Sequence, residues 1–477
     1  MIDLQDLLDS EPVVVAAGPD LLADAIEQQG ARVARTDWRP PVDGTEGALG
    51  RLAAAGRTHE ANTVALDRML AVRPHLVDVG VALEVVPGMT ERTFLHAGPP
   101  LAWDDASGPM RGALIGALLY EGLARTQEEA EARAARGEIE LSPCHHHASV
   151  GPMAGVISPS MPVAVVEDAA GDGVAYATLN EGLGKVLRYG AFGPEVIDRL
   201  RWIEEVLAPV LGAALRSRGP IDLRSLIAQA LQMGDDGHNR NRAVTSLFLR
   251  EIGAALIDEQ GSPPDRRRAV FEFINGNDHF MLNLVMAAGK LGSDAASGVD
   301  ASSLVTVMAR NGTEFGIRLS GTGDTWFTAP APPVEGLYLG SFTEGDASPD
   351  IGDSTITETV GLGGFAMAAA PAIVGFVGGS AAGAVRRTLA MYEITLGEHP
   401  AYQIPMLEFR GTPVGIDAAL VVRPFFVIRL IERVASPEPG GCAATKLPAP
   451  RKLQWGKIAP CCFSAVEELG MMVEIQS

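Results

Sequence analysis

Three consecutive histidines stand out first, because His145, His146 and His147 directly follow Cys144. On an extended segment neighbouring side chains point to opposite faces, so three successive rings cannot bind one metal ion together. A metal site would need partner ligands that the sequence does not place, and we expect neither a metal nor another cofactor. Two interpretations stay open: a buried structural ring, or a ring that acts as acid, base, phosphate contact or phosphoryl carrier. Two glycines and two prolines in residues 150–159 favour function, because they form a rigid loop that presents backbone amides to an anion.

A second polar cluster joins two predicted helices between Gly234 and Arg242, where seven of nine residues are polar or charged. The guanidinium of Arg240 offers a planar fork to a carboxylate or phosphate. His238 can transfer a proton, and Asn239 is both donor and acceptor. The alternative interpretation is an ordinary solvated helix cap.

Two more segments combine polar side chains with glycines. In Asn275–His279, just before an apolar helix, Asn277 or Asp278 either caps that helix or binds a polar group. From Asp353 to Gly364, serines and threonines run into glycines, as in phosphate cradles, but no lysine follows and a P-loop is excluded.

The elements that must position these residues follow from apolar periodicity and turn residues. A strand at Pro12–Ala17, a helix at Leu21–Gln29 and a strand from Ala31 predict a Rossmann-like βαβ unit. It has no G-x-G-x-x-G, so dinucleotide binding is not expected. Further elements are predicted at Ala61–Ala71, Met110–Gly122, Gln127–Arg136, Leu223–Met233 and Ala243–Ile257 (helices), Leu76–Val86 (strand), and Val163–Asp168 with Val174–Asn180 (hairpin).

The dipeptide Asn311-Gly312 predicts a hairpin with a two-residue type I′ turn. That turn would place Met308 opposite Phe315 on the core face and Arg318 on the opposite face. We therefore predict an α/β fold: an N-terminal Rossmann-like domain in residues 1–100, a larger mixed α/β domain in 101–194 and 268–477, and a small helical insert in 195–267.

Charge and composition exclude several classes of partner. The chain has 38 basic and 59 acidic residues, so its formal charge of −21 repels nucleic acid and anionic membranes. Four cysteines in 477 residues are too few for a disulfide framework, and the acidic N-terminus does not resemble a secretory signal, so we expect a cytoplasmic protein. The uncharged stretch Thr359–Val385 is long enough to span a bilayer, but it is so rich in glycine and alanine that a packed segment of the fold is expected.

Taken together, the polar segments resemble the YlbE-like family from about Val13 to about Asp417. The strings that carry the resemblance are SPCHHHASVGPMAGVISPSMPV, MGDDGHNRNRAVTSL, NGNDHFMLNL, NGTEFGIRLSGTGDTWFTAPA and DIGDSTITETVGLGGFAMAAAPAIVG. From Val422 onward the chain departs from the family's glycine-rich ending, and Cys442, Cys461 and Cys462 lie there.

The resemblance implies an α/β fold and a function. Members are similar to the large AllG-type subunit of oxamate carbamoyltransferase, which works with FdrA-like and YlbF-like subunits. The implied reaction converts oxalurate and phosphate to oxamate and carbamoyl phosphate during use of allantoin, and the implied assembly is a homodimer within a larger complex. The Ser-Thr-Arg-Thr phosphate motif of aspartate and ornithine transcarbamylases is missing, so their mechanism is not carried over.

Carbamoyl transfer needs an anion site, donors for the developing oxyanion and a base, and residue type assigns these roles. The catalytic candidates are His146, His238 and Arg240. The substrate-binding candidates are His145, Asn239, Asn277, Arg318, Glu358 and the backbone amides of Gly361, Gly363 and Gly364. Arg240 and Arg318 are assigned to the carboxylate or phosphate of small anionic substrates, namely oxamate and carbamoyl phosphate.

Two other functions stay open. Because FdrA-like proteins resemble succinyl-CoA synthetase, acyl-CoA or phosphohistidine chemistry at His145–His147 is one alternative. The other is a non-catalytic subunit whose polar loops form only an interface between subunits.

Overall fold

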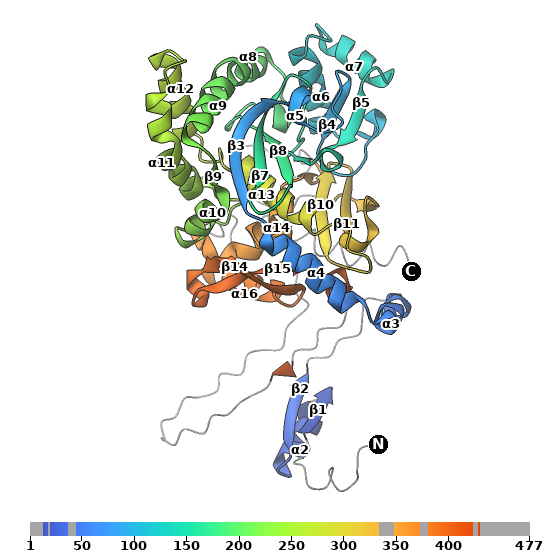
Figure 1. Cartoon of the computed structure of the whole chain (residues 1–477). Coiled ribbons are helices and arrows are strands. Elements are labelled where there is room, and N and C mark those ends of the chain that lie inside the picture. The colour runs from blue at the N-terminus through green and yellow to red at the C-terminus, as the bar shows by residue number, and fades with distance from the viewer. Residues whose placement is uncertain are drawn as a thin grey trace.

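The computed structural model describes residues 13–17, 20–36, 44–332, 348–372, 380–422 and 428–429, and it is a mixed α/β fold, as predicted (Figure 1). The N-terminal unit is the predicted βαβ: β1 (Val13–Ala17), α2 (Asp20–Gln28) and β2 (Arg32–Thr36), with the two strands parallel. A short strand, β16 (Ile428–Arg429), pairs antiparallel with β2. The late cysteines and nearly all of the divergent ending lie outside the described residues.

A five-stranded sheet forms the centre of the main body, in the order β6-β8-β7-β3-β9. The predicted hairpin is confirmed as β7 (Pro162–Asp168) and β8 (Val174–Thr178). The other strands of the five-stranded sheet are β3 (Pro74–Val81), β6 (Ser149–Val150) and β9 (Ile221–Asp222). The predicted strand Leu76–Val86 was too long, because the amides of Ala82 and Leu83 donate to Met161 and Pro159 and begin the short helix α5 (Ala82–Val85).

The helix α13 (Leu282–Ala295) lies at the heart of the fold. It is buried without interruption from Asn283 to Ser293, a stretch that also buries the polar side chains of Asn283, Lys290 and Ser293. One side of α13 packs on β6, β7 and β8, and the other on α14 (Ile356–Thr359) and α4 (Thr58–Ala71). It therefore lies between the central sheet and the segment around α14.

Helices cover the sheet on the side of β9 (Figure 1). They are α8 (Pro194–Trp202), a π-helical turn (Ile203–Leu207), α9 (Ala208–Arg218), α10 (Leu223–Gln232), α11 (Arg242–Asp258) and α12 (Pro264–Asn275). The side chain of Asp222 caps α10, because it accepts from the Ser225 amide at 3.0 Å. The π-helical turn carries the chain past Pro209, which has no amide hydrogen. The division into domains stays a prediction.

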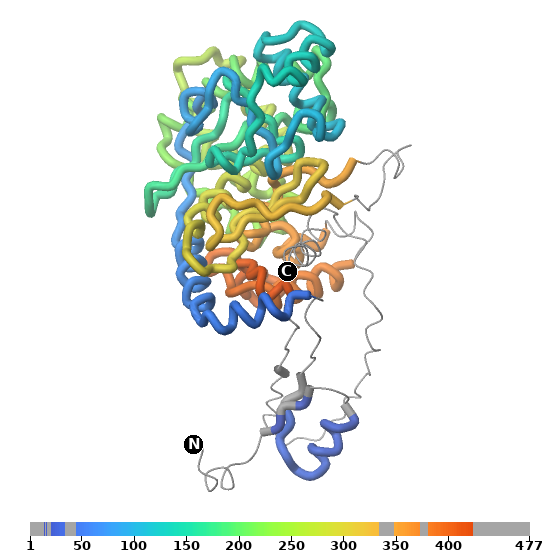
Figure 2. The backbone as a smooth tube through the Cα atoms, turned by 90° about the vertical axis from the view of Figure 1, so that its right-hand side faces the viewer, coloured from blue at the N-terminus to red at the C-terminus, as the bar shows by residue number. Residues whose placement is uncertain are grey.

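A second apolar cluster surrounds α6 (Gly108–Tyr120), with α7 (Gln127–Ala135) packed beside it. Both helices were predicted. Next to them, β4 (Thr93–His96) and β5 (Glu140–Pro143) pair in parallel. Figure 2 shows these teal and light-blue segments at the upper end of the molecule and the yellow strands below them.

Those yellow strands belong to a four-stranded sheet: β10 (Val305–Asn311), β11 (Glu314–Leu319), β12 (Phe327–Pro330) and β13 (Ile351–Gly352). The predicted hairpin forms, but its register was wrong by two residues. Met308 lies opposite Ile317 and not Phe315. The side chain of Asn311 accepts from the amides of Thr313 and Glu314 at 2.9 and 2.7 Å, which lengthens the turn.

The predicted assignment of side chains to the two faces of the hairpin remains correct, because a register shift of two residues keeps each side chain on its side of the sheet. Met308, Phe315 and Ile317 are buried in one apolar cluster, and Arg318 lies on the other face.

The remaining elements are the helices α3 (Glu46–Ala55), α16 (Ala381–Met391) and α17 (Ala418–Val422) and the hairpin of β14 (Thr395–Ile404) with β15 (Arg410–Ile416). Within the described residues, no helix has both the length and the apolar character needed to cross a membrane. In the uncharged stretch, residues 373–379 lie outside the described residues, and the described part contains the last residue of α14, a buried 3₁₀ helix (Gly363–Ala369) and the start of α16.

Candidate functional site

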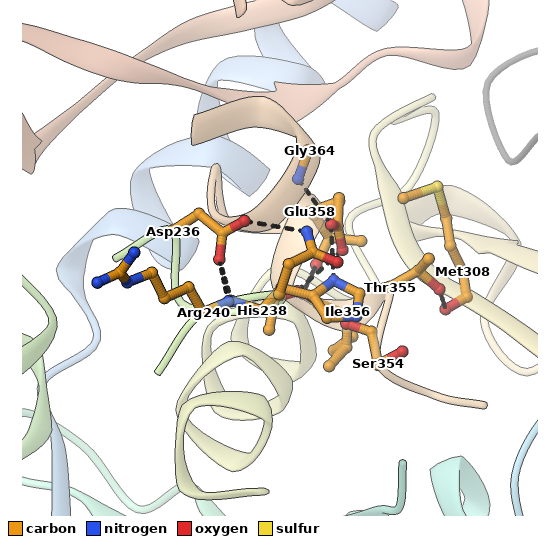
Figure 3. Close-up of polar contacts among 12 residues, drawn as sticks. Asp236, His238, Arg240, Met308, Ser354, Thr355, Ile356, Glu358 and Gly364 are labelled. Atoms are coloured by element: carbon orange, nitrogen blue, oxygen red, sulfur yellow. Dashed lines mark hydrogen bonds and ion pairs between the residues drawn. The ribbon is translucent and has the colours of Figure 1, made fainter. Parts of the chain in front are cut away.

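The segment between Asp350 and Gly364 connects most of the predicted site residues. Asp350 pairs with Arg310, Asp353 with His145, and Glu358 with His238. Figure 3 shows the part of this segment that runs from Ser354 to Gly364 beside the loop that carries His238. One stretch of chain therefore supplies the carboxylates for two histidines.

His238 and Glu358 form a buried histidine–carboxylate pair. The Nδ1 atom of His238 lies 2.8 Å from Oε1 of Glu358. The carboxylate also accepts from the Gly364 amide at 2.9 Å and from the Thr357 hydroxyl at 2.8 Å. Because an ionised carboxylate only accepts, the proton lies on Nδ1 and the lone pair at Nε2. His238 therefore has the tautomer that a general base needs.

Asp236 folds the loop that presents this histidine (Figure 3). Its Oδ1 accepts from the amides of His238 and Arg240 at 3.0 and 2.9 Å, and its Oδ2 accepts from the carboxamide of Asn239 at 2.9 Å. Asp236 is fully buried, so these bonds satisfy a charge that water cannot reach. The side chain of Asn239 therefore holds the loop in shape.

Arg240 lies at the rim of this group, with its side chain 36% exposed. Its Nε lies 3.4 Å from Oδ1 of Asp235. Burial raises the pKa of Asp235 to about 6, while the Val244 amide, which starts α11, donates to the same carboxyl. A half-exposed guanidinium at the edge of a buried pair is accessible to an anion from solvent.

The three glycine amides predicted to bind phosphate already donate within the chain. The amides of Gly361 and Gly364 donate to the carbonyl and the carboxylate of Glu358, and the Gly363 amide donates to the Asp236 carbonyl at 2.7 Å. The glycine turn therefore holds Glu358 against the loop of His238. Gly363 has a φ of +59°, and a Cβ there would lie 1.9 Å from Oε1 of Glu358.

Replacing Gly363 by alanine should displace the carboxylate of Glu358 and destabilise the protein. The strained φ and the overlap together are expected to cost about 1–3 kcal/mol in the free energy of unfolding. Urea unfolding of the variant measures this cost. Gly253→Ala is the matched control, because that helical position has open space and alanine there should be neutral or slightly stabilising. Equal stability of Gly363→Ala and the native chain would contradict the close fit.

The histidine run forms a 3₁₀ turn, Cys144–His147, in which the side chain of His145 is completely buried. Its Nε2 lies 3.3 Å from Oδ1 of Asp353. Asp353 also accepts from the amides of Gly98 at 2.8 Å and Gly151 at 3.1 Å. The loop expected to present amides to an anion therefore does so to a carboxylate of the chain itself.

The other two rings have different surroundings. In His147, Nδ1 lies 2.7 Å from the Pro87 carbonyl and Nε2 lies 2.8 Å from the Ser142 hydroxyl. In His146, Nε2 accepts from the indole of Trp326 at 2.8 Å. Burial, followed by the charge of Arg318, lowers the pKa of His146 to about 4. His146 is therefore neutral at pH 7.

His146 and Arg318 share a pocket with a volume of about 470 Å³. The Arg318 guanidinium bonds to the Gly323 carbonyl and to Asp324, and it lies over the ring of Trp326. The whole lining consists of His145, His146, Ala148, Asp294, Ser297, Arg318 and Asp324.

Replacing Arg318 by glutamine should raise the pKa of His146 above about 4, because a nearby positive charge disfavours the imidazolium. Burial persists in the variant, so the pKa should stay below the ordinary histidine value of about 6.5. In the native chain the folded pKa lies below the unfolded one, so His146 lowers stability as the pH falls from about 6.5 towards 4. NMR titration of the ring measures the shift, with Arg57→Gln as a remote exposed control. An unchanged pKa in the Arg318 variant would contradict the assignment.

Asn277 belongs to a buried amide network beside the His238 pair. Its Nδ2 donates to the carbonyl and side-chain oxygens of Asn180 at 3.1 and 3.2 Å, and its Oδ1 accepts from the His279 amide at 3.2 Å. The pKa of His279 is lowered by burial and then by the charge of Arg188, and His238 acts on the same ring. Asn277 is thus a positioning element for His279 and its neighbours.

The predicted residues therefore fall into two groups. The first holds His238, Asn239, Arg240, Glu358, Gly361, Gly363 and Gly364, with Asn277 alongside. The second holds His145, His146 and Arg318. Among the described residues, no group of three or more histidine, cysteine, aspartate and glutamate side chains is placed to hold a metal ion.

Sequence reasoning missed four residues of these groups: Arg188, His279, Arg310 and Asp353. His279 and Asp353 stood inside segments that were already selected. Arg188 follows two closely spaced glycines, at 182 and 184, both of which have a positive φ. The sequence could have pointed to Arg188 only through these glycines. No feature of the sequence pointed to Arg310, because its position within a strand does not predict its partner.

Fold and site define an α/β protein with a buried histidine–carboxylate pair at a polar loop and arginines close by. The chain belongs to the AllG family, whose model, described as oxamate carbamoyltransferase subunit AllG, matches residues 139–354. This confirms the family prediction. The match includes His145, His238, Asn277 and Arg318 and ends before Glu358.

Two proteins of Escherichia coli and one solved structure illustrate the similarity. The oxamate carbamoyltransferase subunit AllG is 44% identical over 366 residues, which are 76% of this chain and 87% of that protein. The uncharacterized protein YahG is 45% identical over 419 residues, which are 86% of this chain and 89% of that protein. A crystal structure of a conserved protein of unknown function from Enterococcus faecalis is 46% identical with a TM-score of 0.75, and covers 76% of this chain and 87% of that one.

Proposed function

We propose that the chain is a subunit of a carbamoyltransferase that converts oxalurate and phosphate to oxamate and carbamoyl phosphate in purine and allantoin catabolism. Family membership and the similarity to the oxamate carbamoyltransferase subunit AllG support the reaction. The observation that carries a direct role in catalysis is the bond of 2.8 Å between Glu358 and His238. We propose FdrA-like and YlbF-like subunits as partners, a homodimer within the larger complex, and a cytoplasmic location.

In this proposal His238 moves the proton. A phosphate oxygen attacks the ureido carbonyl carbon of oxalurate, and the bond from that carbon to the amide nitrogen of oxamate breaks. The leaving nitrogen takes the electron pair of that bond and a proton from His238, which enters the step as imidazolium. In the reverse direction Nε2 of His238 accepts the proton as the amide nitrogen attacks carbamoyl phosphate and phosphate leaves. Glu358 stabilises the imidazolium in both directions.

Arginines and amides would bind the anionic ends of the substrates. Arg240, at the rim of the His238 pair, is assigned to a carboxylate or phosphate because its guanidinium is half exposed. Arg318 is the second candidate, and an anion there would have to replace Asp324. Asn277 would orient a carbonyl, whereas Asn239 would act through the loop that it braces.

The contacts of the histidine run weigh against the phosphohistidine alternative. Both ring nitrogens of His147 have partners, and Nε2 of His146 accepts from Trp326. The ring of His145 is wholly buried beside Asp353. A phosphoryl carrier needs an accessible nitrogen lone pair, which this arrangement does not favour.

The test is an assay of phosphate-dependent oxalurate cleavage, with the chain alone and with FdrA-like and YlbF-like subunits from the same organism. We expect carbamoyl phosphate to form in the assembled complex. A complex that forms but makes no carbamoyl phosphate would overturn the proposed reaction. Acid-labile phosphate on this chain after incubation with ATP would instead favour the phosphohistidine alternative.

A further inference from the structure

Arg188 is a buried cation that, in the part of the chain the structure describes, has no carboxylate oxygen within 4 Å of its guanidinium. The residue is 7% exposed. Its guanidinium donates to the side chain of Asn180 at 3.3 Å, to the Gly182 carbonyl at 2.5 Å and to the Tyr189 hydroxyl at 3.3 Å. All three acceptors are neutral. Burying a cation without a compensating anion is costly, so such a position is unusual for a purely structural residue.

The other buried arginines do not share this property. Arg310 pairs with Asp350, and Arg318 pairs with Asp324. Glu181 is a carboxylate on which Arg188 acts: burial raises the pKa of Glu181, and the charge of the arginine opposes that rise. Its two oxygens, however, accept from the amides of Leu187 at 2.7 Å and of Arg188 itself at 3.2 Å. Among the described residues the guanidinium therefore bonds only to neutral groups and lies over the ring of Tyr189, 4.6 Å from its centroid, while the charge of Glu181 acts on it from beyond 4 Å.

The position of Arg188 connects it with the His238 group. Oδ1 of Asn180 accepts both from Arg188, at 3.3 Å, and from Asn277, at 3.2 Å. The side-chain oxygen of Asn277 in turn accepts a hydrogen bond from the His279 amide. The charges of Arg188 and His238 both lower the pKa of the His279 ring. Hydrogen bonds through Asn180 and Asn277 thus link Arg188 to His279, and the charge of Arg188 reaches the ring of His279.

We propose that Arg188, together with the ring of His279, binds a small oxyanion, namely a phosphate group, next to His238, while Asn277 positions both through its hydrogen bonds. A guanidinium provides two parallel donors to phosphate, and the bound anion would supply a countercharge in direct contact, which no carboxylate of the described residues provides. The identity of the anion rests on the proposed carbamoyl transfer, in which phosphate is a reactant. The binding itself does not depend on that reaction.

Calorimetric titration of the full chain with inorganic phosphate tests the site. We expect Arg188→Gln to weaken phosphate binding at least about tenfold, which is typical for the loss of a charged hydrogen-bond donor. Arg188→Lys keeps the charge without the fork and should give an intermediate affinity. Arg199→Gln is the matched control, because Arg199 braces the same loop through the carbonyls of Glu181 and Leu183. Its affinity should stay within about twofold of the native value.

Melting temperatures of all variants are measured in parallel. If Arg188→Gln does not fold, the phosphate affinity of Arg188→Lys tests the proposal instead. A native-like affinity of Arg188→Lys would then overturn the proposal. Absence of phosphate binding by the native chain would also overturn it, as would equal weakening by Arg199→Gln. A complex without carbamoyltransferase activity whose chain still binds phosphate through Arg188 would refute the proposed function and support this inference.

Discussion

Replacing Glu358 by glutamine is expected to lower the turnover number of the assembled enzyme by about 100-fold to 10,000-fold, with a much smaller change in KM. A carboxamide can donate to Nδ1 of His238, which moves the imidazole proton to Nε2, the atom that accepts the substrate proton in the direction of oxalurate synthesis. It also removes the negative charge that stabilises the imidazolium. Loss of the orienting carboxylate has an effect of this size in other histidine–carboxylate pairs.

Steady-state kinetics at saturating phosphate measure this effect, and circular dichroism establishes that the variant is folded. Glu121→Gln is the matched control, because the carboxylate of Glu121 also bonds to several donors, the hydroxyls of Ser158 and Ser160 and the Ser160 amide, in another part of the fold. The control should keep native kinetics. If Glu358→Gln turned over at the native rate, the pair would be structural.

The largest loss of stability is expected from Arg310→Met. The guanidinium of Arg310 is almost wholly buried, with Nη2 and Nε at 3.1 and 3.0 Å from the two carboxylate oxygens of Asp350. Its Nη1 donates to the Thr355 hydroxyl at 2.6 Å. Methionine fills part of the space but leaves a buried carboxylate without its cation, which costs about 3–5 kcal/mol. Because Asp350 and Thr355 flank Asp353, we also expect the histidine partners of this segment to lose their positions.

Urea unfolding measures the free energy, and the double variant Arg310→Met with Asp350→Asn isolates the charge effect. Because the double variant leaves no unpaired charge, it should recover a substantial part of the loss. A loss below about 1 kcal/mol for Arg310→Met would mean that water or local movement compensates Asp350. No recovery in the double variant would assign the loss to packing.

Much of the fold could be predicted because it depends on local patterns. Periodicity gave the helices α4, α6, α7, α10 and α11. The hairpin register could not be predicted, because the turn at Asn311 is set by contacts with distant residues. The Nδ2 atom of Asn311 donates to the carbonyl of Pro99, and the hydroxyl of Thr313 donates to the carbonyl of Asp105. These tertiary hydrogen bonds outweigh the local preference for a two-residue turn.

The candidate site divides in the same way. His238, Glu358 and Asn277 were selected because polar residues near glycines and helix ends are unusual in a chain this apolar. Their partners were not predictable, since 120 residues separate His238 from Glu358. The glycines were selected for the wrong reason: their amides hold a carboxylate of the chain where a phosphate was expected. Arg188 was missed because only the folded structure shows that it lacks an ion pair.

The role of His238 is tested most directly by measuring carbamoyl phosphate formation from oxalurate and phosphate by the complex assembled with His238→Gln. Glutamine is close in size and still bonds to Glu358, but it cannot exchange a proton near pH 7. We expect a decrease in turnover number of at least about 100-fold, while the exposed control His59→Gln leaves it unchanged. A His238→Gln complex that forms carbamoyl phosphate at the native rate would contradict His238 as the group that moves the proton.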